Sequence, residues 1–150
     1  MVDVLPGSLK GRVLSALDGA EWTKALSRPN ENIVKTPRHY FYPECNEDVS
    51  SVVKWAAEHK VVVAIKGGGN SQQGASSCDD GLVIDLGKMN SIKIEKESIR
   101  LGGGCLWGEV YKVAKEAGIL VIGGGANSVG IGGFLTGGEA SVDVKAGTRG

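Results

Sequence analysis

Hydrophobic and polar residues between positions 38 and 86 follow the pattern of a strand, a helix and two further strands. Short apolar runs predict strands at 38–42, 61–65 and 82–86, and the second run is continuous and β-branched, which is typical of a buried strand. The residues between the first two runs predict a helix that Asn46 would cap, because its apolar positions recur at the spacing of one helix face. Those positions are Val49, Val52, Val53, Ala56 and Ala57.

The second half of the chain predicts shorter elements. Strands are expected at 92–94 and 99–101, separated by a charged turn, and a last strand is expected at 119–122. Residues 106–117 predict an amphipathic helix that ends at Gly118. Near the N-terminus, 8–17 predicts a short helix and 27–32 a loop. Mixed strands and helices in this order predict the α+β class.

Glycine is concentrated in the second half of the chain: of 24 glycines, 21 lie in residues 67–150. Three triple-glycine runs, at 67–69, 102–104 and 123–125, each follow a predicted strand. Such a run exposes backbone N–H groups with no side chain in the way, which suits a phosphate. Around the first run, Lys66 adds a cation and Asn70, Ser71 and Ser76 add hydrogen-bonding side chains.

Standard nucleotide motifs are absent from these loops. The dinucleotide pattern GxGxxG fails because Gln72 and Ser128 stand where its last glycine would be, and the P-loop pattern fails at Gly87-Lys88-Met89. Two interpretations therefore stay open from the residues alone. The glycines either make tight strand exits or form a phosphate- or nucleotide-binding module of another kind.

Composition narrows the class of protein. Lys plus Arg and Asp plus Glu both number 17, so the chain lacks the basic excess expected of nucleic-acid or anionic-membrane binders. No apolar run approaches the ~18 residues of a membrane span, and the N-terminus does not read as a secretory signal. Three cysteines without a CxxC pattern, and two histidines, predict neither a disulfide framework nor a metal site. An intracellular location is favoured, and the location is otherwise left open.

The first glycine loop carries a resemblance to a known family. Ile65-Lys66-Gly67-Gly68-Gly69-Asn70-Ser71, with Gly74 beyond, resembles the pyrophosphate loop of the vanillyl-alcohol-oxidase superfamily. The nearest branch is that of the berberine-bridge-enzyme-like and 6-hydroxynicotine-oxidase-like FAD-linked oxidases. Three further stretches agree in order and spacing: 42–49, 82–86 with Met89-Asn90, and the second glycine loop, which runs from Gly123 to Gly138.

This resemblance implies the N-terminal part of a PCMH-type FAD-binding domain. The expected fold is a small β-α-β subdomain and part of a second mixed sheet with glycine-rich loops. The resemblance divides the chain into an N-terminal extension (1–35), a partial FAD-binding domain (36–138) and a divergent tail (139–150), with no substrate domain. The family transfers a hydride from a small-molecule substrate to flavin N5 and reoxidises the flavin with oxygen.

The resemblance also implies the cofactor site. The expected FAD-binding residues are Lys66, Gly67, Gly68, Gly69, Asn70, Ser71, Gly74, Ser76, Val129, Gly130 and Gly133. FAD is expected to be non-covalent, because Asn70 and Ala126 stand where relatives have a linking His and Cys. No catalytic residue is identified, and a truncated, non-catalytic fragment or pseudoenzyme is the alternative.

Overall fold

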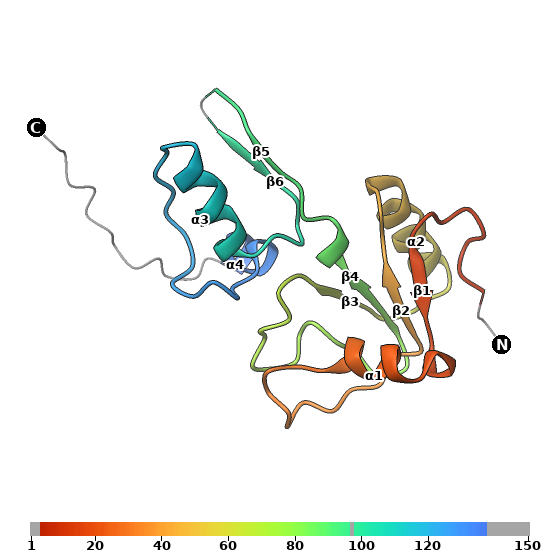
Figure 1. Cartoon of the computed structure of the whole chain (residues 1–150). Coiled ribbons are helices and arrows are strands. Elements are labelled where there is room, and N and C mark those ends of the chain that lie inside the picture. Colours follow the sequence, from red (N-terminus) through yellow and green to blue (C-terminus); the bar gives the residue numbers. More distant parts are fainter. Residues whose placement is uncertain (1–3, 97, 138–150) are drawn as a thin grey trace, which may run out of the picture.

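The structure is a computed structural model that describes residues 4–96 and 98–137 of the 150-residue chain. It contains a four-stranded mixed sheet and a two-stranded antiparallel sheet (Figure 1). The strands are β1 (Arg12–Leu14), β2 (His39–Tyr42), β3 (Val63–Lys66), β4 (Leu82–Asp85), β5 (Ile92–Ile94) and β6 (Ile99–Leu101). The helices are η1 (Ala16–Asp18), α1 (Ala20–Leu26), α2 (Asn46–Glu58), η2 (Leu86–Lys88), α3 (Trp107–Glu116) and α4 (Ile131–Gly137).

The larger sheet has the strand order β1-β2-β4-β3, so β4 lies between the two strands that precede it in the sequence. β4 pairs in parallel with both β2 and β3, and all four of its residues are buried. Its side chains alternate between two cores. Leu82 and Ile84 pack with Trp55 of α2 on one face, whereas Val83 packs with Trp22 of α1 on the other.

The predicted helix at 8–17 is wrong. Arg12–Leu14 is a strand that pairs antiparallel with β2, and Ser15 caps the short helix η1 instead. Gly11 explains how the chain reaches this edge, because a Cβ at that position would lie 2.1 Å from the carbonyl oxygen of Tyr42. Residues 4–35 therefore supply β1 to the sheet and α1 to the core on one of its faces.

The apolar run 61–65 forms a strand, β3, but the prediction that this strand is buried is wrong. β3 lies at the edge of the sheet, where Val62 and Ile65 are exposed and Ala64 is the buried residue of the strand. Ala64 packs in the α1 core on one face and Val63 packs against the α2 core on the other, so the strand is partly buried on both faces.

Four other features differ from the sequence-based expectations. Residues 119–122 form no strand, and Leu120 and Ile122 are exposed. The cap of α2 is Cys45, and Asn46 is its first helical residue. The helical face of α2 is also shifted from the predicted one, because Trp55 is buried while Val53 and Ala57 are exposed. Finally, the second glycine loop contains the helix α4. Its glycines have a low helix propensity, so the sequence did not predict this helix.

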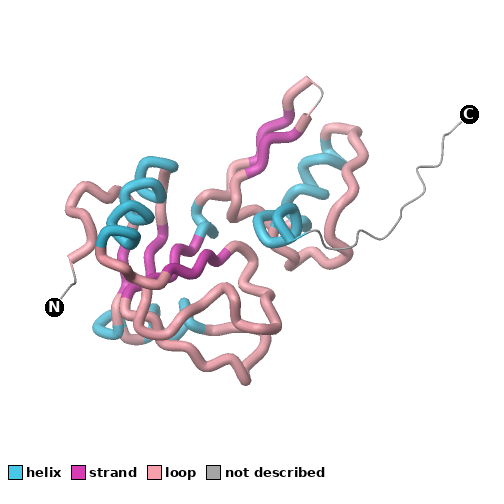
Figure 2. Tube along the Cα trace, turned by 180° about the vertical axis from the view of Figure 1, so that it is seen from behind, coloured by secondary structure: helices cyan, strands magenta, loops and turns pink. Residues whose placement is uncertain are grey.

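The strands predicted at 92–94 and 99–101 and the helix predicted at 106–117 are confirmed. β5 and β6 pair antiparallel, and α3 is followed by Gly118 with a positive φ of 70°. Trp107 and Tyr111, one helical turn apart, stack with ring centroids 5.5 Å apart. Seen from behind, the hairpin, α3 and α4 lie to one side of the four-stranded sheet and are joined to it by loops (Figure 2).

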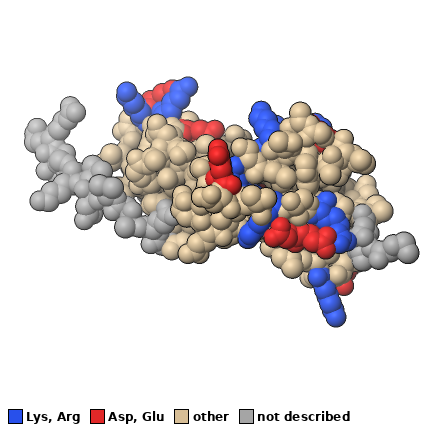
Figure 3. Space-filling model, turned by 90° about the horizontal axis from the view of Figure 1, so that it is seen from below, with Lys and Arg blue, Asp and Glu red and all other residues tan. Residues whose placement is uncertain are grey.

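Charges on the surface are mixed. On the face in Figure 3, acidic and basic side chains of the described residues lie beside one another, and most of the surface between them is uncharged. None of the helices in the described ranges is both long and apolar enough to cross a membrane.

A buried carboxylate ties the N-terminal segment to α2. Asp48 is 3% exposed and accepts hydrogen bonds from the backbone N–H groups of Lys10, Gly11 and Glu44 at 2.9, 3.0 and 3.0 Å. Burial opposes the ionisation of Asp48, but these donors outweigh burial and hold the pKa of the carboxyl below its usual range. The charged form therefore stabilises the fold.

We expect Asp48→Asn to lower the free energy of unfolding by about 2–3 kcal/mol at pH 7, because an amide offers fewer acceptor sites to three buried donors. A lowered pKa in the folded state stabilises the protein above the unfolded pKa of about 4, and this contribution disappears as the pH falls through the folded value. Urea unfolding from pH 7 to pH 3 should therefore show the two proteins converging at acid pH. Glu116→Gln, at the exposed end of α3, is the control; a difference independent of pH would contradict this account.

Candidate functional site

The first and second glycine loops meet backbone against backbone. A Cβ added to Gly68 would lie 2.7 Å from the backbone nitrogen of Gly130, and one added to Gly130 would lie 2.3 Å from the nitrogen of Gly68. Real side chains do not fit at such distances, so the two loops approach this closely only because both residues are glycine. Gly69 follows with a φ of 74°, which also favours glycine.

The triple-glycine run at 102–104 joins the same junction. The carbonyl oxygen of Gly103 lies 3.3 Å from a Cβ built on Gly67 and 3.0 Å from one built on Gly132. The contacting glycines of the three segments (67–68, 103 and 130–132) lie more than about 25 residues apart in sequence, and no spacing rule pairs them. Glycine is therefore required at the junction for close packing as well as for turning the chain.

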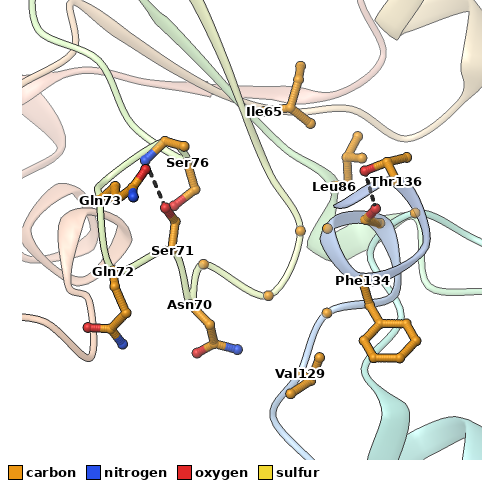
Figure 4. Close-up of a pocket in the computed structure, with 18 residues that line it drawn as sticks. Ile65, Asn70, Ser71, Gln72, Gln73, Ser76, Leu86, Val129, Phe134 and Thr136 are labelled. Atoms are coloured by element: carbon orange, nitrogen blue, oxygen red, sulfur yellow. Dashed lines mark hydrogen bonds between the residues drawn. The ribbon is translucent and has the colours of Figure 1, made fainter. Parts of the chain in front are cut away.

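A cavity of about 750 Å³ opens beside this junction (Figure 4). One wall carries the polar side chains of Asn70, Ser71, Gln72, Gln73 and Ser76, and the opposite wall carries Leu86, Val129, Phe134 and Thr136. The volume is in the range of small-molecule and cofactor sites. The cavity can therefore take a ligand with one polar, anionic end and one flat or apolar end.

Nine of the eleven sequence-predicted site residues line this cavity. They are Gly67, Gly68, Gly69, Asn70, Ser71, Ser76, Val129, Gly130 and Gly133. The loop from Gly68 to Ser71 leaves its backbone N–H groups without a backbone acceptor in the described ranges. The hydroxyl of Ser71 accepts a bond from the N–H of Ala75 at 3.0 Å, which leaves its proton free to donate. This wall is rich in donors, as an anion requires.

Lys66 does not line the cavity. Its ammonium group donates to the hydroxyl of Tyr40 at 2.7 Å and to the Asp85 carboxylate at 2.9 Å. Tyr40 in turn donates to the same Asp85 oxygen at 2.5 Å. Burial, and then this bond to a carboxylate, raise the pKa of Tyr40 far above its usual range. The cation expected at the phosphate is therefore part of a buried network under the sheet.

Gly74 also lies outside the cavity wall, on the far side of the loop. It is buried with a φ of 72°, and a Cβ there would lie 2.7 Å from the Ile33 side chain. Its carbonyl accepts a hydrogen bond from the ammonium of Lys35 at 3.0 Å. Gly74 thus holds the loop against Ile33 and Lys35.

Asn70 connects the two glycine loops. Its side-chain amide donates to the carbonyl oxygen of Ser128 at 2.5 Å. Ala126 is exposed and does not line the cavity, and its carbonyl accepts the N–H of Val129 at 3.1 Å. The amide of Asn70 therefore acts as a tie between loops, a role that a carboxamide can fill and that needs no nucleophile.

Several residues of the cavity were not among the predicted ones. They are Ile65, Gln72, Gln73, Ala75, Leu86, Gly103, Gly132, Phe134 and Thr136. Gln72 and Gln73 belong to the same loop as the predicted residues, and that continuity was an available signal. Phe134 and Thr136 lie on α4, which the sequence did not predict, so nothing indicated their orientation.

The residues present fit a flavin nucleotide. The backbone N–H groups from Gly68 to Ser71 border the cavity and have no backbone acceptor among the described residues, which is the condition for a diphosphate to bind them. The apolar wall provides a surface for a flat ring. Of the described residues, no group of three His, Cys, Asp or Glu side chains could hold a metal ion.

Relatives of known sequence share this part of the chain. The chain is 30% identical over 140 residues to an FAD-linked oxidoreductase of Bacillus subtilis (strain 168), and the match covers 92% of this chain and 31% of that protein. It is 33% identical over 103 residues to the (R)-6-hydroxynicotine oxidase of Paenarthrobacter nicotinovorans, covering 67% of this chain and 22% of that one. The chain therefore spans less than a third of the length of these relatives.

Solved structures show the same architecture. The crystal structure of 6-hydroxy-D-nicotine oxidase from Arthrobacter nicotinovorans superposes with a TM-score of 0.78 at 27% identity, over 83% of this chain and 28% of that one. Xylooligosaccharide oxidase from Myceliophthora thermophila superposes with a TM-score of 0.74 at 28% identity, over 83% and 27% of the two chains. The expected fold, the N-terminal part of a PCMH-type FAD-binding domain, is confirmed.

A family profile describes the chain directly. The profile of the FAD binding domain matches residues 37–148, and so extends into the segment 139–150 that was expected to diverge and that lies outside the described residues. The match takes in both cavity-lining glycine loops and the run at 102–104. This chain belongs to the FAD binding domain family, the flavin-binding part of FAD-linked oxidoreductases and oxidases.

Proposed function

We propose that this chain holds FAD non-covalently in the glycine-loop cavity, as the flavin-binding part of an oxidase that acts on a small-molecule substrate. The observation that carries the proposal is the contact of Gly68 with Gly130, which places unpaired backbone N–H groups beside a cavity of about 750 Å³. A basic surface for nucleic acid is not part of this proposal, because the net formal charge is zero.

The two walls of the cavity suit two parts of the cofactor, its diphosphate and its flavin. Backbone N–H groups from Gly67 to Ser71, with the Ser76 hydroxyl, would hold the diphosphate, and Val129, Gly130 and Gly133 would lie along the rest of the cofactor. Lys66 and Gly74, which lie behind the loop, would act by holding it in shape. FAD would supply the acceptor for a hydride and pass the electrons to oxygen.

Non-covalent binding is supported by the residues at the expected linkage positions. Asn70 is an amide that is already bonded to Ser128, and Ala126 has only a methyl group. The thiol of Cys105, which follows the triple-glycine run at 102–104, is fully buried, and burial raises its pKa above the usual range. A buried neutral thiol is a poor nucleophile.

The direct test is a titration of the purified chain with FAD, followed by flavin fluorescence and the visible spectrum. We expect saturable binding, and we expect acid precipitation to leave all of the flavin in the supernatant because no bond links it to the protein. Flavin that stays with the precipitate would contradict non-covalent binding. A flat titration would mean that the chain is a fragment that does not bind the cofactor.

Gly68→Ala should reduce the affinity for FAD at least tenfold, because its Cβ would collide with the backbone of Gly130 and separate the two loops. Gly137→Ala is a matched control, since a Cβ there meets nothing within 4 Å and the position is outside the cavity wall. The same titration measures both. Equal affinities for the two variants would place the cofactor elsewhere.

Lys66→Met tests whether this cation holds the loop or the phosphate. Removing it leaves Asp85, which is 5% exposed, without its cation, so we expect a loss of about 3–5 kcal/mol in the free energy of unfolding. Lys88→Met, at an exposed position, should change stability by less than about 0.5 kcal/mol. Weaker FAD binding at unchanged stability would instead make Lys66 a direct ligand.

A further inference from the structure

One buried cation near the cavity has no charged partner. Arg28 is 8% exposed, and its Nη1 donates to the hydroxyl oxygen of Ser76 at 2.9 Å. Its Nη2 is buried and has no hydrogen-bond partner among the described residues. No carboxylate of the described ranges lies within ion-pair distance of Arg28, in contrast to Lys66, which has Asp85.

Such a group is costly by itself. Removing a guanidinium from water is unfavourable unless an opposite charge or a full set of hydrogen bonds compensates. Ser76 supplies one neutral acceptor, which does not compensate a full charge. The arrangement therefore suits a protein in which an anion completes the site.

Ser76 connects Arg28 to the cavity. Its hydroxyl has one proton and accepts the bond from Arg28, so the proton is available to donate in another direction. Ser76 is part of the polar wall, and a donor there adds to the backbone N–H groups of the loop. Accepting a bond from a cation also makes the hydroxyl a stronger donor, because successive hydrogen bonds polarise each other.

A second cation, Lys35, binds the same loop. The ammonium of Lys35 donates to the carbonyl oxygens of Gly74 and Ser77 at 3.0 and 3.3 Å. Arg28 and Lys35 both come from the segment between α1 and β2. This segment therefore places two positive charges behind the cavity wall, and neither touches the cavity directly.

We propose that Arg28 is a positioning residue for the diphosphate of the ligand, acting through the Ser76 hydroxyl. The guanidinium fixes that hydroxyl as a donor toward the cavity and supplies the positive charge that the backbone N–H groups lack. The inference rests on the proposed function only for the identity of the ligand as FAD. The chemistry that it requires is a diphosphate group.

The experiment uses the full chain with three substitutions, Arg28→Met, Arg28→Lys and Ser76→Ala, and Arg100→Met as the control. Arg100 is a surface arginine on the β5–β6 hairpin with a side chain 75% exposed. Three probes are titrated: FAD, riboflavin, which has no phosphate, and inorganic pyrophosphate, which has no flavin. Thermal melting of the ligand-free proteins is the fourth measurement.

Arg28→Met and Ser76→Ala should each weaken FAD binding about tenfold or more, as expected for a hydrogen bond to a charged group. Both should remove the rise in melting temperature that pyrophosphate gives the wild type, and both should leave riboflavin binding unchanged. A double variant that combines Arg28→Met with Ser76→Ala, titrated with the same probes, should lose little more FAD affinity than either single variant, since the two residues act as a unit. Arg28→Lys should recover part of the lost FAD affinity, because it restores the positive charge but not the planar N–H donors of the guanidinium.

The ligand-free protein separates this role from a structural one. Replacing an uncompensated buried charge by an apolar side chain of similar volume should leave the melting temperature of Arg28→Met equal to that of the wild type or higher. A lower melting temperature with equal losses for all three probes would overturn the proposal. If Arg28→Met does not fold, Ser76→Ala decides: undiminished FAD and pyrophosphate binding in that variant would overturn it.

The outcomes also separate this proposal from the proposed function. A wild-type chain that is stabilised by pyrophosphate but does not bind FAD would support the role of Arg28 and refute FAD as the ligand. A chain that binds FAD equally well in all variants would support FAD as the ligand and refute the role of Arg28.

Discussion

The contact of Gly68 with Gly130 is the constraint on which the rest of the site depends. It joins a loop at the end of the four-stranded sheet to a loop that precedes α4, and neither residue could carry a side chain. The Asn70 amide adds a directional bond across the same junction. The cavity lies beside this contact, with one wall from each loop. A single atom at either glycine would therefore change the packing of both parts and the shape of the cavity together.

Buried charges in this chain fall into two groups. Asp48 and Asp85 each have several donors, from backbone N–H groups in one case and from Lys66, Tyr40 and Gly87 in the other. Both are satisfied within the fold. Arg28 is not satisfied among the described residues, and its hydrogen-bond partner, Ser76, lines the cavity. Groups that complete their partners internally stabilise a protein, whereas an incomplete one near a cavity is typical of a binding site.

The sequence predicted correctly those features whose conformation depends on neighbouring residues. The first glycine loop, the β5–β6 hairpin and the Gly118 end of α3 depend on nearby residues, and all were predicted. The predictions were wrong where the conformation depends on residues far away in the sequence. Arg12–Leu14 has helical spacing but pairs with β2, and 61–65 looks like a central strand but lies at an edge. Lys66 stands beside the loop in sequence yet pairs with Asp85, while Arg28, which precedes Ser76 by 48 residues, bonds to its hydroxyl.

The strand order has a consequence for how the sheet can form. β2 and β3 do not touch each other as neighbours, since β4 lies between them and pairs with both. A chain made from its N-terminus therefore completes β3 before β4, the strand with which it pairs, has been made. Pairing between distant segments is slow to form because the connecting loops must close first. β4 supplies Leu82 and Ile84 to one core and Val83 to the other, so both cores are completed only when the middle strand of the sheet has been made.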